Sequence, residues 1–399
     1  MIDSTSSDDE IAIFLQMVKA KAPSDAALAA RLAQVLADSG ERYSSVLGLA
    51  ADVASTGGPS SLSTLLCPLF LRSAGLVVPK LGVPGRPAGG IDCLAQVDGY
   101  RTGLLPEELE GVIQRSGYAH FVAAGRYAPL DARVFKLRQL HGAQQVPTLV
   151  AASLLAKKLA VGVKRAGLDV RVAPHGNFGS SWDEARTNSK LFVEAARMLG
   201  IEAFPVLTEG RHPYQPYIGR GEALVALSSI FDGTASPWLL RHLEQCRMLA
   251  LAVAPKRLCV HIATASPHEL QEYFFANLIA QEGSPSAFNR VVQFVKSSHV
   301  QELRVFDDGF FSVSMNGVRK VLVQYQATAE QQEHGFTDPV GVILLREPGE
   351  WVRKGDVVAT IRVVDTKIQQ SAVRELSTWI CRTSSTPMGV WGEGVTLDE

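Results

Sequence analysis

Cysteine is scarce in this sequence, and the few cysteines do not fall into pairs. The 399 residues contain only Cys67, Cys93, Cys246, Cys259 and Cys381. No two of them have the short spacing of metal ligands. An odd and dispersed set of thiols is typical of proteins in a reducing compartment. We therefore predict a cytoplasmic protein, and we expect neither a metal nor another cofactor.

Long apolar runs and a strong net charge are also missing. No run of about 18 apolar residues indicates a membrane span, and the polar, acidic first ten residues argue against a signal peptide. The 39 basic and 40 acidic residues give a net charge of −1, without a basic stripe interleaved with aromatics. We therefore expect neither nucleic acid nor a membrane as partner. The 46% of hydrophobic residues suffice for a sizeable core, and the length indicates two or three domains.

A loop rich in glycine and hydroxyl side chains precedes an apolar, helix-like run. Residues 52–64 read Asp-Val-Ala-Ser-Thr-Gly-Gly-Pro-Ser-Ser-Leu-Ser-Thr. The two glycines allow the backbone to turn sharply and to approach a ligand closely. Ser60 or Ser61 would cap the following helix, whose free N–H groups favour anions. Such a loop alone is more often an ordinary tight turn, so its interpretation depends on the rest of the chain.

Helices and short strands alternate over most of the chain. Apolar spacing predicts helices at residues 10–20, 26–38 and 147–166, and a capped helix from Ser181 to about Gly200. Strands are predicted at residues 76–81, 168–172, 203–207 and 258–263. This alternation predicts an α/β layer with a mostly parallel sheet.

The composition changes after about residue 290, where short strands dominate. We predict these strands at residues 300–306, 310–315, 321–325, 340–345 and 357–363. The segment is interpreted as a separate C-terminal domain of mixed, mainly β character.

Several stretches, taken in order, resemble the pyrimidine-nucleoside phosphorylases, the family of thymidine phosphorylase. The loop at residues 52–64 is similar to that family's Asp-Lys-His-Ser-Thr-Gly-Gly loop, and residues 146–158 resemble its base-binding helix. Residues 125–138, 169–172 and 338–356 resemble further segments of the family. The resemblance covers roughly residues 10–363, and the common order of the pieces makes it specific.

This resemblance implies a three-part fold and a cleft. We expect a small all-helical domain (residues 1–50 with 130–166) and a larger α/β domain with a mostly parallel sheet (residues 51–129 with 167–290). A C-terminal α+β domain would follow at residues 291–399. The resemblance also implies a homodimer formed through the helical domain, and an active cleft between the first two domains. Rotation of the domains would close that cleft and exclude water.

The same resemblance assigns a base-binding site. In the family an arginine, a serine and a lysine bind the pyrimidine, and their counterparts here are Arg138, Ser153 and Lys157. Cleavage of an N-glycosidic bond leaves negative charge on the departing base, which Arg138 and Lys157 would stabilise as catalytic residues. Ser153 would donate a hydrogen bond to the base, and it shares a helix face with Lys157 four positions on.

The acceptor site departs from the family pattern. The lysine and histidine that follow the loop aspartate in the family are Val53 and Ala54 here, and two further hydroxyl positions have no counterpart. A charge-assisted hydrogen bond contributes about 1.5–3 kcal/mol, so these losses would weaken phosphate binding by a few powers of ten. The predicted phosphate or acceptor site comprises Ser55, Thr56, Gly57, Gly58 and Ser63.

Three functions stay open at this point. The favoured one is a pentosyltransferase of the pyrimidine-nucleoside phosphorylase type, which cleaves a pyrimidine nucleoside or nucleotide with phosphate as acceptor. The second is a phosphate-independent hydrolase or pentosyl transferase of specialised biosynthesis, and the third is a non-catalytic pyrimidine binder. His175 and His212 lie in loops and receive no role, because lone loop histidines are more often structural.

Overall fold

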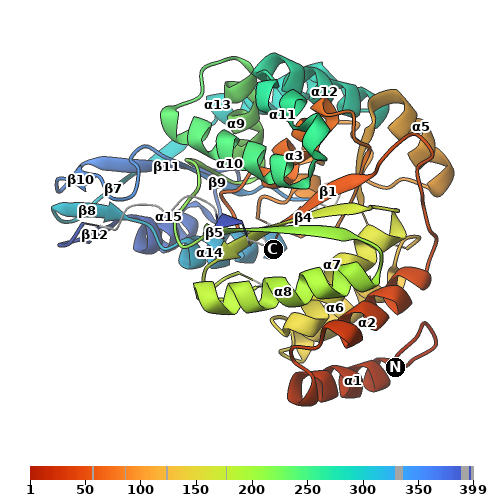
Figure 1. The fold of residues 1–399 in the computed structure, drawn as a ribbon. Helices are drawn as coiled ribbons and strands as arrows, with labels where there is room; N and C mark the ends of the chain where they lie inside the picture. Colours follow the sequence, from red (N-terminus) through yellow and green to blue (C-terminus); the bar gives the residue numbers. More distant parts are fainter. Residues whose placement is uncertain are drawn as a thin grey trace.

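The computed structural model describes residues 1–55, 58–85, 87–122, 125–176, 178–328, 336–387 and 395–396. Parallel strands cross the middle of the molecule, helices cover both of their faces, and an antiparallel part lies at one end (Figure 1). This arrangement confirms the predicted α/β fold class with a C-terminal α+β part. The three residue ranges assigned to domains, the homodimer and the cytoplasmic location stay predictions.

The central sheet is built from parallel strands in the order β1-β4-β5, with the short β13 antiparallel at its edge. An isolated bridge between Ala50 and Val77 joins β1 to the parallel pair β2–β3. The register places Ser55 beside Asp169 and Lys80 beside His120. The bounds are β1 (Ala51–Ser55), β2 (Val78–Gly82), β3 (Tyr118–Val122), β4 (Arg165–Val172), β5 (Glu202–Glu209) and β13 (Val395–Thr396).

One face of the sheet is covered by a group of five helices, drawn below the strands in Figure 1. Their apolar sides share one hydrophobic core with that face of the sheet. The helices are α1 (Asp8–Lys21), α2 (Ala26–Asp38), α6 (Pro129–Leu140), α7 (Pro147–Ala160) and α8 (Trp182–Met198). The last of these carries the predicted cap, because Ser181 accepts a hydrogen bond from the backbone N–H of Glu184.

Helix α7 is shorter than the predicted helix at residues 147–166. Gly162 adopts a φ of 68° just after the helix, a left-handed conformation that favours glycine and ends the helical turn. Gly167, the residue after the predicted end of the helix, lies inside β4, where an added Cβ would stand 2.5 Å from Val253 and 2.9 Å from Val53. Gly167 therefore serves close packing within the sheet, and Gly162 terminates the helix.

The opposite face of the sheet carries a second set of helices and a second core. These helices are α3 (Ser63–Ser73), α4 (Gly90–Leu94), α5 (Pro106–Ser116), α9 (Arg220–Phe231), α10 (Pro237–Val253), η1 (Lys256–Leu258), α11 (Cys259–Thr264), α12 (Pro267–Ala280) and α13 (Pro285–Ser297). The buried apolar side chains of α5 belong to the first core. The predicted strand at residues 258–263 is wrong, because this segment is helical. Of its side chains only Ile262 is buried, and Arg247 donates hydrogen bonds to the carbonyls at the end of α11.

The C-terminal part forms antiparallel sheets around a third core. Its elements are β7 (Val300–Arg304), β8 (Gly309–Ser312), α14 (Met315–Thr328), β9 (Val340–Leu344), β10 (Trp351–Val352), β11 (Val357–Val363), α15 (Gln369–Ile380) and β12 (Arg382–Ser384). A short strand, β6 (Tyr217–Ile218), pairs with β9 and joins this part to the rest. The predicted strand at residues 321–325 is wrong, because Val318, Val321, Leu322 and Tyr325 are buried at helical spacing within α14.

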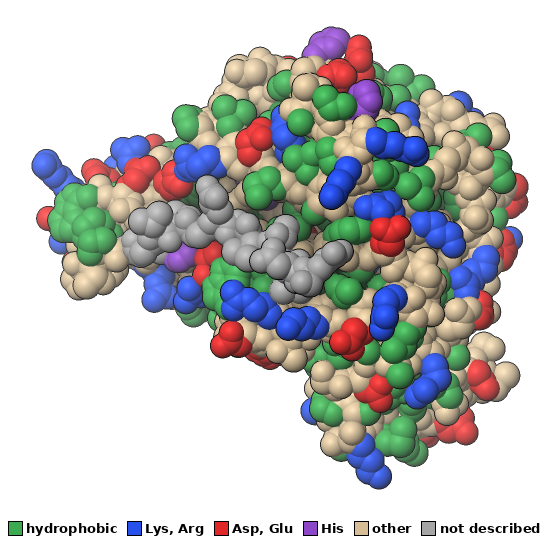
Figure 2. All heavy atoms as spheres, in the orientation of Figure 1, with side chains coloured by type: hydrophobic (Ala, Val, Ile, Leu, Met, Phe, Trp, Pro, Cys, Tyr) green, Lys and Arg blue, Asp and Glu red, His purple; other side chains and the backbone are tan. Residues whose placement is uncertain are grey.

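The surface of the molecule carries charges of both signs. Basic and acidic side chains are interspersed over the described part of the face seen in Figure 2. Among the helices that the structure describes, none is both long enough and apolar enough to cross a membrane.

Candidate functional site

A cavity of about 300 Å³ opens where the central strands meet α7 and α14. Strands β1 and β2, the segment after β2, helices α6 and α7, the loop after β4 and helix α14 all contribute to its wall. Arg138, Ser153 and Lys157, the three residues of the predicted base site, all line this one cavity. The structure therefore brings together residues from two helices that the sequence separates by up to 19 positions.

Lys157 and Ser153 form a pre-arranged polar pair on α7. The Nζ atom of Lys157 donates to Ser153 Oγ at 2.9 Å and to Asp131 Oδ2 at 2.6 Å. Asp131 is buried in the first turn of α6, so its carboxylate fixes the lysine without taking space in the cavity. An ammonium has three protons, and acceptors among the described residues take two of those of Lys157. The third is available for a ligand.

Arg138 lies in the last turn of α6, and its guanidinium contacts the chain that leads into α7. It donates to the backbone carbonyls of Gln144 at 2.6 Å, Leu149 at 3.1 Å and Ala143 at 3.3 Å. The side chain is 3% exposed but still contributes to the cavity wall. Arg138 therefore holds the connection between α6 and α7 in place and presents a positive charge to the cavity.

Sequence reasoning missed a buried cluster of two lysines and one aspartate. Asp52, on β1, is fully buried and pairs with Lys158 of α7 and with Lys80 of β2, the latter at 2.7 Å. Burial acts to raise the pKa of Asp52, but the two lysines outweigh it and hold that pKa below its ordinary value. Both lysines line the cavity. One carboxylate thus faces two cations, which leaves an excess positive charge beside the cavity.

The sequence did contain a signal for this cluster. Lys80 interrupts the otherwise apolar strand predicted at residues 76–81, and a lysine is rarely buried unless it has a partner. Its partner is 28 residues away and becomes its neighbour only through the pairing of β1 with β2. The structure thus identifies Asp52 as the residue that allows Lys80 to be buried.

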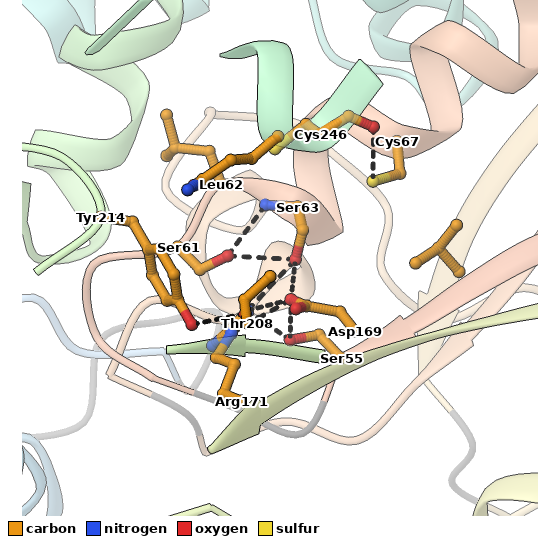
Figure 3. Close-up of polar contacts among 12 residues, drawn as sticks. Ser55, Ser61, Leu62, Ser63, Cys67, Asp169, Arg171, Thr208, Tyr214 and Cys246 are labelled. Atoms are coloured by element: carbon orange, nitrogen blue, oxygen red, sulfur yellow. Dashed lines mark hydrogen bonds and ion pairs between the residues drawn. The ribbon is translucent and has the colours of Figure 1, made fainter. Parts of the chain in front are cut away.

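The serines of the predicted acceptor site take part in an ion-pair network (Figure 3). The hydroxyls of Ser55 and Ser63 donate to Asp169 Oδ2 at 3.2 and 2.8 Å, and Arg171 donates to both hydroxyls at 2.5 and 3.1 Å. Arg171 also pairs with the same carboxylate at 2.6 Å. Ser55 lines the cavity, whereas Ser63 is buried behind it. Thr56 and Gly57 lie outside the described residues.

The described glycine of the loop approaches a side chain of the protein. Gly58 has a φ of 139°, and an added Cβ would lie 2.5 Å from a guanidinium nitrogen of Arg171. The backbone at this position therefore needs glycine because of both its conformation and the contact with Arg171. The sequence predicted a close approach to a ligand, which stays a prediction; the approach in the structure is to Arg171.

The helix after the loop starts later than predicted. Helix α3 begins at Ser63, and Leu62 stands at the N-cap without a capping side chain, so neither Ser60 nor Ser61 caps the helix. The hydroxyl of Ser60 accepts instead from the backbone N–H of Tyr214 at 3.1 Å. The Nε2 atom of His242 accepts from the backbone N–H of Leu62 at 2.9 Å. The loop is thus held from behind by residues that are distant in the sequence.

Tyr214 and His242 form an aromatic support for this loop. Their rings stack with centroids 5.3 Å apart, and the guanidinium of Arg171 lies 5.5 Å from the centre of the Tyr214 ring. His212, two residues before Tyr214, is half-buried. The contacts of the residues around Tyr214 therefore give this stretch a structural role behind the loop.

We predict that His242 makes the stability of the protein depend on pH. Burial, with a contribution from the charge of Arg171, lowers the pKa of His242 from 6.5 to about 4. As pH falls below 6.5 the unfolded chain binds this proton first, so stability that is present above pH 6.5 is lost toward pH 4. The expected loss is about 3 kcal/mol. Urea unfolding at pH 7, 5.5 and 4 measures it.

The control for this experiment is a second histidine variant. H242Q should lose most of the pH-dependent difference, whereas H268Q, at an exposed histidine of α12, should keep the wild-type pH dependence. Equal pH slopes for wild type and H242Q would contradict the assignment.

Three further side chains of the cavity wall come from the loop after β4 and from α14. They are His175, Asn316 and Arg319. Burial, followed by the charges of Arg171 and Arg319, lowers the pKa of His175 to about 4, so its imidazole is neutral at pH 7. Sequence reasoning did not assign Asn316 or Arg319, because it predicted a strand where α14 continues. His175 reaches the cavity, although a loop histidine alone gave little reason to expect it.

Known relatives match the chain along most of its length. It is 24% identical to a pyrimidine-nucleoside phosphorylase of Geobacillus stearothermophilus over 371 residues, which is 90% of this chain and 85% of the relative. It is 24% identical to a pyrimidine-nucleoside phosphorylase of Bacillus subtilis (88% and 82% of the two chains) and 25% identical to a thymidine phosphorylase of Agrobacterium fabrum (82% and 77%). No family model matches the chain. With this similarity, the chain is a divergent relative of the pyrimidine-nucleoside phosphorylases and thymidine phosphorylases.

Proposed function

We propose that this protein is a pentosyltransferase that cleaves the N-glycosidic bond of a pyrimidine nucleoside or nucleotide and transfers the pentose to phosphate. The observation that carries the proposal is the shared cavity. Arg138, Ser153 and Lys157 line it, and so do the end of β1 and both lysines of the buried cluster. The similarity to enzymes named pyrimidine-nucleoside phosphorylase supports the same reaction class.

The α7 side of the cavity suits a departing base. A pyrimidine that leaves its sugar carries negative charge on its carbonyl oxygens and ring nitrogen. The remaining proton of Lys157 and the charge of Arg138 would stabilise that anion, and their fixed positions would avoid reorganisation during the reaction. Ser153, held 2.9 Å from Lys157, would orient the base edge.

The β1 side of the cavity suits an oxyanion acceptor. In the resembled family a lysine stands at the position of Val53, and here the Nζ atom of Lys80 lies 2.7 Å from the carbonyl oxygen of Val53. We propose that Lys80 supplies, from the neighbouring strand, the cation that Val53 lacks. Because Lys80 and Lys158 share the single carboxylate of Asp52, their excess positive charge would attract phosphate.

A second candidate function is pentosyl transfer to an acceptor other than phosphate, including water. The observation in its favour is the state of the loop: Val53 and Ala54 are apolar, and the hydroxyls of Ser55 and Ser63 are engaged by Asp169 and Arg171. An uncharged acceptor would need fewer hydrogen-bond donors from the loop after β1.

The test is base release from uridine, thymidine and UMP, measured with and without phosphate. We expect release only with phosphate, and for each base released one pentose 1-phosphate from a nucleoside or one ribose 1,5-bisphosphate from UMP. K80M should raise the KM for phosphate about 10- to 100-fold, as expected for one lost charge-assisted hydrogen bond. K190M, at an exposed lysine of α8, is the matched control and should leave this KM unchanged.

Two other outcomes would indicate another function, and a third would contradict the role of Lys80. Base release that does not depend on phosphate would favour the second candidate. Pyrimidine binding without release from any of the three substrates would indicate a non-catalytic binder. A KM for phosphate that is the same in K80M and in wild type would contradict the role of Lys80.

A further inference from the structure

Helix α14 of the C-terminal part places two polar side chains in the cavity wall. Asn316 and Arg319 are three positions apart, so they lie on the same face of the helix, and both line the cavity together with His175. The rest of α14 packs into the C-terminal core through Val318, Val321 and Leu322. The helix thus anchors itself by its apolar side and presents polar groups to the site.

The guanidinium of Arg319 carries a positive charge that no carboxylate of the described residues balances. Its guanidinium is partly buried, and this burial lowers the pKa of Arg319. Within the described residues no carboxylate forms an ion pair with it, in contrast to Lys157, Lys80 and Lys158, which all have one. Desolvating a charge is costly unless a partner compensates it. A ligand in the cavity can provide that partner.

The acceptor does not account for this charge. In the proposed function the excess charge of Lys80 and Lys158 serves the acceptor phosphate, and Lys157 is balanced by Asp131. A pyrimidine nucleoside is neutral and would leave Arg319 uncompensated. A nucleoside monophosphate would bring a second anionic group, and a guanidinium can hold two phosphate oxygens at once.

We propose that the substrate is a nucleoside monophosphate whose phosphate is bound by Arg319, with Asn316 and His175 as hydrogen-bond donors. This inference rests on the proposed function, because it names the substrate of the same cavity. Asn316 offers its amide N–H groups, and a neutral imidazole offers one N–H. The three side chains come from two separate segments, so the subsite forms only where α14 meets the loop after β4.

The test compares UMP with uridine on the full chain. Wild type should show a higher kcat/KM for UMP than for uridine, and R319Q should lower the ratio of the two about 10- to 100-fold, as expected for a lost charge-assisted contact. R319K should restore part of the ratio. R353Q, at an exposed arginine after β10, is the control and should keep the wild-type ratio. A wild-type ratio near one, or a ratio unchanged in R319Q, overturns the proposal.

Two further measurements separate this proposal from its alternatives. If Arg319 binds the acceptor instead, R319Q will raise the KM for inorganic phosphate with uridine as substrate, and the UMP-to-uridine ratio will not change; that outcome also overturns the proposal. If neither compound releases base, the proposed function fails. Calorimetry of UMP and uridine binding then still tests the phosphate subsite at Arg319. Tighter binding of UMP that R319Q abolishes supports the subsite, and equal binding of the two overturns it.

Discussion

Replacing Lys157 by methionine is expected to lower kcat/KM for base release by about 10²- to 10³-fold, the effect of removing one donor that stabilises developing negative charge. The Nζ atom of Lys157 is fixed at 2.6 Å from Asp131 and 2.9 Å from Ser153, so its remaining proton is directed before the substrate arrives. Methionine keeps the length of the side chain but loses the charge. Steady-state kinetics on UMP and uridine with phosphate measure the effect.

This variant also affects folding, so a second variant is needed. Without Lys157 the buried carboxylate of Asp131 has no cation, and breaking a buried pair costs about 3–5 kcal/mol of stability. The double variant K157M/D131N removes the orphaned charge and should recover most of that stability without recovering activity. S153A should lower activity less, because it removes a neutral hydrogen bond worth about 1 kcal/mol. Activity of the double variant close to wild type would exclude Lys157 from catalysis.

The base half of the site was accessible from the sequence because its geometry is local. Ser153 and Lys157 are one helical turn apart, so their common face follows from the helix alone. The position of Arg138 came from resemblance to a family, and the structure places it on the wall of the same cavity. The carboxylate that orients Lys157 was not predicted, because Asp131 belongs to another helix and only the packing of α6 against α7 brings it within 2.6 Å.

The acceptor half was predicted less well, because its contacts are long-range. Ser55 and Ser63 were taken from the loop pattern, but Asp169 and Arg171, which bind both hydroxyls, come from β4 more than 100 residues away. Lys80 reaches Asp52 only through the pairing of adjacent strands. Strand order and register are not visible in a single sequence, so these partners could not be assigned.

The contribution of α14 was missed for a different reason. A run of β-branched and aliphatic residues at 321–325 matches the propensity of a strand, although the buried positions Val318, Val321, Leu322 and Tyr325 follow the period of a helix. Because strand propensity was given more weight than helical periodicity, Arg319 was predicted to precede a strand and not to lie on a helix. The polar face of α14 was therefore not considered as part of a site.

The second large effect is expected from R362M, which should lower the free energy of unfolding by about 3–5 kcal/mol. Arg362, on β11, is 3% exposed and pairs with Glu222 of α9 at 2.7 Å and with Asp338 at 2.6 Å. The pair with Glu222 links the C-terminal sheet to α9. Without the arginine, two buried carboxylates face each other with no cation between them.

The pH dependence of this variant identifies the cause. Burial raises the pKa of Glu222 even in the presence of Arg362, and removal of that cation would raise it further. Since the folded variant would then bind a proton more readily than the unfolded chain, its deficit should shrink as pH falls from 7 to 5. R304M, which breaks the exposed pair of Arg304 with Glu302 on β7, is the control and should cost less than about 1 kcal/mol at any pH.

Arg362 also fixes the C-terminal part, which includes α14, against the α/β part. If R362M loses both stability and selectivity for UMP, the position of Arg319 depends on the ion pairs of Arg362. A deficit below about 1 kcal/mol, or one that does not change with pH, would show that the buried pairs do not hold the two parts together.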